Sequence, residues 1–169
     1  MRTFLRTLIW LALVVWIGGL LFFGAVVAPV AFGPLRAMFP DPAVGIGMAG
    51  IVVRDSLLRL HDIGIFCGIA LAALCVLERV TRATRRSIGP QLLLIGVMLG
   101  LTAYSQFSVI PRMDRLRVQA GPAIADPTST NRARLDFDRL HNLSTSLEGV
   151  VLLAGLGLII LYSRPELAS

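Results

Sequence analysis

The last long apolar stretch of the chain begins with side chains that could do chemistry. Its segment "FDRLHNLSTSLEGV" (137–150) holds a histidine, two serines, a threonine and a glutamate. At 100° per residue, one narrow stripe of a helix would hold His141, Ser144, Thr145 and Glu148. Lipid cannot satisfy such groups, so we expect the stripe to meet other polar groups inside a helix bundle.

Glu148 has the largest cost of burial in this stripe. It lies about 12 Å below the expected start of its helix, near the bilayer middle, where a carboxylate costs several kcal/mol unless it is protonated or paired. The preceding span offers polar neighbours in Thr102, Tyr104, Ser105 and Gln106. Two interpretations stay open: a carboxylate that binds a proton or a cation, and a neutral acid that only joins helices.

The other histidine of the chain, His61, begins an earlier apolar stretch. With four membrane crossings, it lies at the same membrane face as His141. Its helical stripe contains Gly64, Gly68 and Cys75, and small residues mark the side on which helices approach closely. The pattern predicts that both histidines point into the bundle.

The two histidines admit three interpretations. Inward imidazoles on different helices at similar depth would permit a haem b site. A copper or zinc site could add Asp62 or Asp138 as a ligand. In the third interpretation, both histidines only hydrogen-bond loop backbone at the membrane surface. No H-x-x-E or C-x-x-C spacing favours a ligand site, so we expect no resident cofactor, with haem or copper/zinc as the alternatives.

The composition explains what must hold these residues. Hydrophobic residues make up 56% of the chain and the mean hydropathy is +0.78, far outside the range of soluble domains. Long apolar runs occur four times, at about 4–30, 58–79, 90–110 and 140–162. The sequence therefore predicts an all-α integral membrane four-helix bundle, formed by one domain of residues 1–169.

The connections are assigned from prolines, glycines and length. Residues 33–42, with three prolines, and the polar residues 111–137 are expected to form loops. Between them, "AVGIGMAGIVV" (43–53) is apolar but too short to cross, so it is expected to be an amphipathic or re-entrant segment. No internal repeat is recognised.

All sixteen basic residues are arginine, and the formal net charge is +6. They lie in short segments beside apolar spans, which indicates membrane orientation and not nucleic-acid binding. Lipid phosphate groups are the expected partners of Arg112, Arg115 and Arg117. The cluster "RVTRATRR" (79–86) favours cytoplasmic termini in a bacterial inner membrane, although more arginines lie on the opposite side. Besides the lipid bilayer, a second copy of the chain is an option as a partner.

Four segments together resemble the transmembrane protein 205-like family. Its F-x-x-x-H-x-x-S pattern is met by Phe137, His141 and Ser144, whereas the W-x-G-G pattern of the first span is also similar to copper-resistance D-type membrane proteins. The resemblance implies a four-span membrane protein whose activity is not established, and it suggests traffic of soft metals because a eukaryotic member is associated with tolerance of platinum drugs. Where the family often has asparagine, this chain has Glu148, which favours a proton-linked role. The segments are "WIGGLLFFGAVVAPVAF" (16–32), "AGIVV…LLRLHDIG" (49–64), "VIPR" (109–112) and "FDRLHNLSTSLEG" (137–149).

The sequence thus gives a hypothesis about function with two alternatives. A polar cluster between helices binds or moves a small solute, a proton or a soft metal ion. Alternatively, the chain is a haem- or metal-binding redox protein, or a structural or partner-binding protein without a ligand. No phosphate-binding glycine loop, G-x-S-x-G or zinc-protease motif occurs, so no enzyme activity is predicted.

Overall fold

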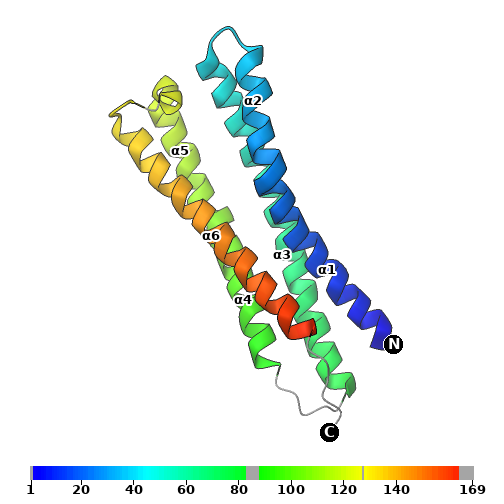
Figure 1. Ribbon diagram of the computed structural model, residues 1–169. Helices are drawn as coiled ribbons and strands as arrows, with labels where there is room; N and C mark the ends of the chain where they lie inside the picture. The colour runs from blue at the N-terminus through cyan, green and yellow to red at the C-terminus, as the bar shows by residue number, and fades with distance from the viewer. Residues whose placement is uncertain (1, 83–87, 127, 164–169) are drawn as a thin grey trace.

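The computed structural model describes residues 2–82, 88–126 and 128–163. These ranges form long helices that run side by side, and no strand occurs in them (Figure 1). Four helical rods are long and apolar enough to cross a membrane: Thr3–Met38, Pro42–Thr81, Gly89–Ala125 and Arg132–Ser163. The predicted all-α, four-helix membrane bundle is confirmed.

The first rod continues through a proline. Pro29 has no N–H to donate, and its ring crowds the carbonyl four residues earlier. A wider π-helical turn accommodates it, in which the Ala28 N–H donates to the Phe23 carbonyl five residues back. The hydrogen bonding changes at this point without ending the rod. The rod consists of α1 (Arg2–Phe22), the π-helical turn η1 (Phe23–Val27) and α2 (Ala28–Met38).

The structure corrects two expectations for the first connection. Residues 33–42 are not a loop throughout, because α2 runs on to Met38 with Pro34 inside it. Residues 43–53 are not a separate segment, because they form the first turns of α3 (Pro42–Arg82), which continues unbroken into the second span. Packing of α2 along α3 outweighs the local tendency of proline and glycine to end a helix.

The second half of the chain corrects the expected polar loop at 111–137. Most of this segment is helical, and its charged residues support the helix through i, i+4 pairs such as Arg134 with Asp138, 3.1 Å apart. Pro111 again follows a π-helical turn. The elements are α4 (Gly89–Tyr104), η2 (Ser105–Val109), α5 (Ile110–Ala120), the 3₁₀-helix η3 (Gly121–Ala125) and α6 (Arg132–Ser163).

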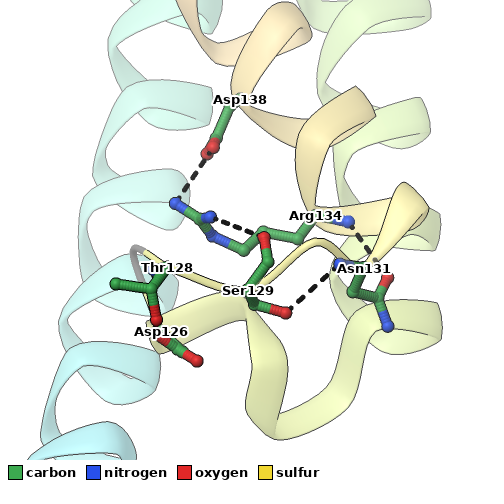
Figure 2. Close-up of polar contacts among 6 residues, drawn as sticks. All are labelled: Asp126, Thr128, Ser129, Asn131, Arg134 and Asp138. Carbon is green, nitrogen blue, oxygen red and sulfur yellow. Dashed lines mark hydrogen bonds and ion pairs between the residues drawn. The ribbon is translucent and has the colours of Figure 1, made fainter.

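Polar side chains in the connection between η3 and α6 stabilise the first turn of α6 (Figure 2). Asn131 Oδ1 accepts hydrogen bonds from the backbone N–H groups of Ala133 (2.9 Å) and Arg134 (3.3 Å), as an N-cap does. Earlier in the connection, Asp126 Oδ1 accepts from both the hydroxyl and the N–H of Thr128, which lowers the pKa of Asp126. The contribution of this pair to stability is therefore present above the unfolded pKa of about 3.9 and is lost as the pH falls through the lower folded value.

The two halves of the chain repeat one structure, contrary to the expectation of no internal repeat. In each half, a π-helical turn ends two residues before a proline, at Pro29 and at Pro111. Residues at matching distances before these turns are buried in both halves: Leu13, Trp16 and Leu20 in α1, and Ile95, Met98 and Thr102 in α4. The chain therefore contains two copies of one helical hairpin, one in each half.

The second helix of each hairpin carries the same motif. Residues 54–61 read "RDSLLRLH" and residues 134–141 read "RLDFDRLH", so both arginines, the leucine and the histidine match. Few other positions are identical, which explains why the repeat is hidden in the sequence and becomes plain from the matching π-turns and buried positions.

The hairpins pack into a ring at the end where the chain begins. There α1 packs on α3, α3 on α4, α4 on α6, and α6 closes on α1. Toward the other end, here called the α2/α5 end, α2 follows α3 and α5 follows α6, and the halves meet there through α3, which contacts η3 and pairs with α5 at Arg54 and Asp114. The buried core lies in the closed part and contains Ile9, Leu13, Trp16, Leu71, Met98, Val151 and Leu158. Much of its outer surface is apolar, as lipid requires, with Phe66, Leu93 and Leu153 exposed.

The α2–α3 contact gives a test of this packing. A Cβ at Gly45 would lie 2.7 Å from the Cα of Arg36 and against the Leu35 carbonyl, whereas a Cβ at Gly47 would meet no atom within 4 Å. We expect Gly45→Val to lower the free energy of unfolding by about 1–3 kcal/mol more than Gly47→Val, because backbone atoms cannot move aside. Thermal unfolding in detergent measures both, and equal effects would contradict the close α2–α3 packing.

Candidate functional site

The centre of the site is a contact between the two halves of the chain. His61 on α3 and Glu148 on α6 approach with His61 Nε2 and Glu148 Oε1 2.8 Å apart. The His61 side chain is 1% exposed and that of Glu148 is 18% exposed. In a hydrogen bond between an imidazole and a carboxyl group, the shared proton can reside on either group. The bond also gives Glu148, the group with the largest cost of burial in the sequence, a polar partner inside the apolar bundle.

Further polar groups lie at the same level on the third rod. Gln106 Nε2 donates to Asp62 Oδ1 at 2.6 Å, which aligns this turn of η2 with the turn of α3 that holds His61. Ser105 and Thr102 point into the bundle and are 0% and 1% exposed. Among the described residues, neither hydroxyl has a hydrogen-bond partner, and the same holds for His61 Nδ1 and Glu148 Oε2. Gln106 Oε1 is likewise buried without a partner in the described part of the chain, so five such polar atoms occur at this level of α3, α6 and the third rod.

The π-helical turn η2 helps to place these groups. It begins at Ser105, and a π-helical turn shifts the following side chains around the helix relative to an α-helix. Thr102 and Ser105 are both buried before Pro111, while Phe107 faces outward. In the first rod, the equivalent turn η1 has no buried residue. Only the second π-turn supplies polar side chains to the interior.

Charged residues on the surface show where lipid ends. Arg59 and Asp62 on α3 and Arg139 on α6 are exposed, and an exposed charge facing hydrocarbon is costly. The boundary at the α2/α5 end therefore lies close to the level of Asp62, the neighbour of His61. The Glu148 site lies near this boundary and not at the bilayer middle, because Glu148 contacts His61, the neighbour of Asp62.

His141 does not point into the bundle as expected. It is exposed and stacks on Phe137, with ring centroids 6.2 Å apart and planes 3° from parallel. The prediction for the stripe is therefore wrong at His141, where the described residues leave this level of α6 exposed. About two turns of α6, or about 10 Å, separate His141 from the glutamate bonded to His61, so the structure does not bring the two imidazoles together as haem ligands.

The remaining residues of the predicted stripe divide between interior and surface. Ser144 is 5% exposed and lies within the bundle. Thr145 is exposed, and its hydroxyl donates to the His141 carbonyl at 3.1 Å. The hydroxyl of Thr145 is thus held between the levels of His141 and Glu148.

The expected metal ligands are placed apart. Asp62 accepts from Gln106, and Asp138 pairs with Arg134 (Figure 2). Within residues 2–82, 88–126 and 128–163, no three histidine, cysteine, aspartate or glutamate side chains gather as metal ligands would. Cys67 and Cys75 are buried further along α3, about two and four turns from His61.

The three arginines expected at lipid headgroups differ in placement. Arg112 and Arg115 are exposed, as a headgroup contact requires. Arg117 is only partly exposed, and its guanidinium lies 5.4 Å from the centre of the Phe137 ring, in a cation–π contact. Arg117 therefore packs within the protein.

Sequence reasoning missed three polar contacts between the halves, one of which is the Gln106–Asp62 bond described above. It did not pair His61 with Glu148, because helical phase gives the face of each helix and not the partner of that face. It also missed Arg54, whose guanidinium binds Asp114 Oδ2 on α5 at 2.6 Å and Asp55 on its own helix at 2.7 Å. The signal for Arg54 was the repeated motif "RDSLLRLH" and "RLDFDRLH".

The four long apolar helices define a multi-pass membrane protein, and the His61–Glu148 contact forms a polar centre between its two hairpins. Comparison with known families matches residues 11–122 to the domain of unknown function DUF4149. This match covers more than half of the chain, and the chain belongs to that family. No curated protein and no solved structure matches the chain.

A double-mutant cycle tests the central contact. His61→Ala and Glu148→Ala each leave a polar partner without its hydrogen bond, so their effects on stability should be coupled by about 1–3 kcal/mol. The exposed pair Asp136 and Arg139, 3.3 Å apart, is the control and should be coupled by less than about 1 kcal/mol. Additive effects of the His61 and Glu148 substitutions in detergent unfolding would contradict the contact.

Proposed function

We propose that this membrane protein binds and releases a proton at the His61–Glu148 pair, and that this step serves the movement of a proton or a small solute across the bilayer. The observation that carries the proposal is the 2.8 Å contact between His61 Nε2 and Glu148 Oε1 inside an apolar bundle. Ionisable groups in such places are costly to keep, and function is the usual reason for keeping them.

The chemistry of the pair supports proton exchange. With one proton between them, the pair exists either as a neutral acid beside a neutral imidazole or as a carboxylate beside an imidazolium. In a poorly polar site, the cost of burying two charges and their mutual attraction oppose each other. Gaining or losing one proton changes the net charge of the pair by one, which is the event that a proton-coupled protein needs.

The donor atoms around the pair favour a proton or a hydrated small cation over a soft metal. The unpaired buried atoms at this level among the described residues are four oxygens, from Thr102, Ser105, Gln106 and Glu148, and one nitrogen, from His61. Oxygen groups suit hard cations and water, whereas soft metals prefer thiolate ligands. The two cysteines lie further along α3.

The resemblance to the transmembrane protein 205-like family fits this proposal. In that family asparagine often stands where this chain has Glu148, so the proton-binding step is a property of chains with an acid at this position. Cytoplasmic termini in a bacterial inner membrane belong to the same proposal, supported by the arginine cluster at 79–86. The α2/α5 end then faces the opposite side.

Proton flux into liposomes tests the function. Purified protein is reconstituted with a pH-sensitive dye inside, and an acid step is applied outside under a fixed membrane potential. Glu148→Gln keeps the size of the side chain but cannot ionise, so we expect flux to fall to the rate of protein-free liposomes. Glu78→Gln, the same change near the far end of α3, is the matched control and should retain flux.

Infrared titration of the same variants separates binding from transport. A protonated-carboxyl band that appears with falling pH in the wild type should be missing in Glu148→Gln and present in Glu78→Gln. Unchanged flux and an unchanged carboxyl signal in Glu148→Gln would overturn the proposal and leave a role in helix packing.

A further inference from the structure

The repeated hairpin contains two equivalent histidines with different surroundings. His61 and His141 end the same motif on α3 and α6, yet His61 is 1% exposed and His141 lies at the surface. The position in α3 that corresponds to Glu148 is Gly68, seven residues after the histidine in each case. A carboxylate is thus present for one histidine and absent for the other.

Packing explains why the second carboxylate is missing. A Cβ at Gly68 would lie 2.5 Å from Leu99 Cδ2 and 2.7 Å from Trp16 Cζ3, so a longer side chain has no room there. Among the described residues, the ring nitrogens of His141 have no hydrogen-bond partner, and Phe137 holds the ring by stacking. His141 is therefore a free imidazole in a fixed place.

A stripe of polar side chains joins this imidazole to the buried site. His141, Ser144, Thr145 and Glu148 follow one another at helical spacing from the α2/α5 end toward the interior. The two ends differ in exposure, since His141 is exposed whereas Glu148 is 18% exposed and His61 beyond it is 1% exposed; between them Ser144 is buried and Thr145 is exposed. The hydroxyl of Thr145 is oriented by its bond to the His141 carbonyl.

We propose that His141 is the proton-exchanging group at the surface that loads and unloads Glu148 from the α2/α5 end. This inference rests on the proposed function. A hydronium ion gives its proton to neutral His141. The imidazolium then passes a proton through solvent water and the hydroxyls of Ser144 and Thr145 to a carboxylate oxygen of Glu148, and His141 returns to the neutral form.

Imidazole suits this task by its ordinary chemistry. Its unperturbed pKa of about 6.5 lets it accept and release protons near neutral pH. The charged groups around this level are largely paired: Arg54 with Asp114 and Asp55, and Arg134 with Asp138, while Arg117 lies over the Phe137 ring. Among the described residues, these pairs leave the His141 imidazole as the ionisable side chain without a charged partner at the exposed end of the stripe.

Proton flux in the liposome assay tests this step separately from the site itself. His141→Ala should slow proton entry by at least about tenfold, a modest loss for a proton-transfer group. Small imidazole buffers in the solution should restore much of the rate, because they can deliver the proton in place of the missing side chain. Asn142→Ala, at the neighbouring exposed position, is the control and should keep the wild-type rate.

The outcomes separate the two proposals. Loss of flux in Glu148→Gln with unchanged flux in His141→Ala overturns the role of His141 and keeps the proton site. A slow His141→Ala variant that imidazole does not rescue also overturns it, since a folding defect would give that result. Unchanged flux in Glu148→Gln overturns the proposed function, and the role of His141 falls with it.

Discussion

One constraint organises this protein: a carboxylate placed among apolar helices must have a partner within hydrogen-bond reach. Glu148 finds that partner in His61, across the boundary between the two halves. The contact fixes the register of α6 against α3, and the bond between Gln106 and Asp62 fixes α4 against α3 at the same level. Helices held only by apolar contacts can slide at small cost, whereas hydrogen bonds of this kind allow one arrangement.

The duplicated hairpin shows how a small membrane chain can build an asymmetric site. Both halves supply a rod with a π-turn before a proline and a second helix with the same arginine–histidine motif. The site nevertheless forms once, because the position equivalent to Glu148 is Gly68, packed against Trp16 and Leu99. Equivalent backbones with different side chains give one buried histidine and one exposed histidine.

Prolines explain most of the difference between the expected and observed elements. Local preference assigns loops to residues 33–42 and 111–137, but both segments are largely helical. The π-turns absorb the missing N–H of Pro29 and Pro111, and packing against α3 or α6 repays the local cost. The long rods that result carry the hairpins past the lipid boundary at the α2/α5 end.

The sequence by itself determined the class and the polar face. Apolar runs set the four spans, and the spacing of Ser144 and Glu148 correctly set their side of the last helix, because hydropathy and helical phase are local properties. Only the tertiary structure decided that Glu148 meets His61, that Gln106 bonds to Asp62 next to them, and that His141 is left exposed. Which helix covers a given face depends on how the two hairpins pack on each other, and no local pattern in one helix contains that information.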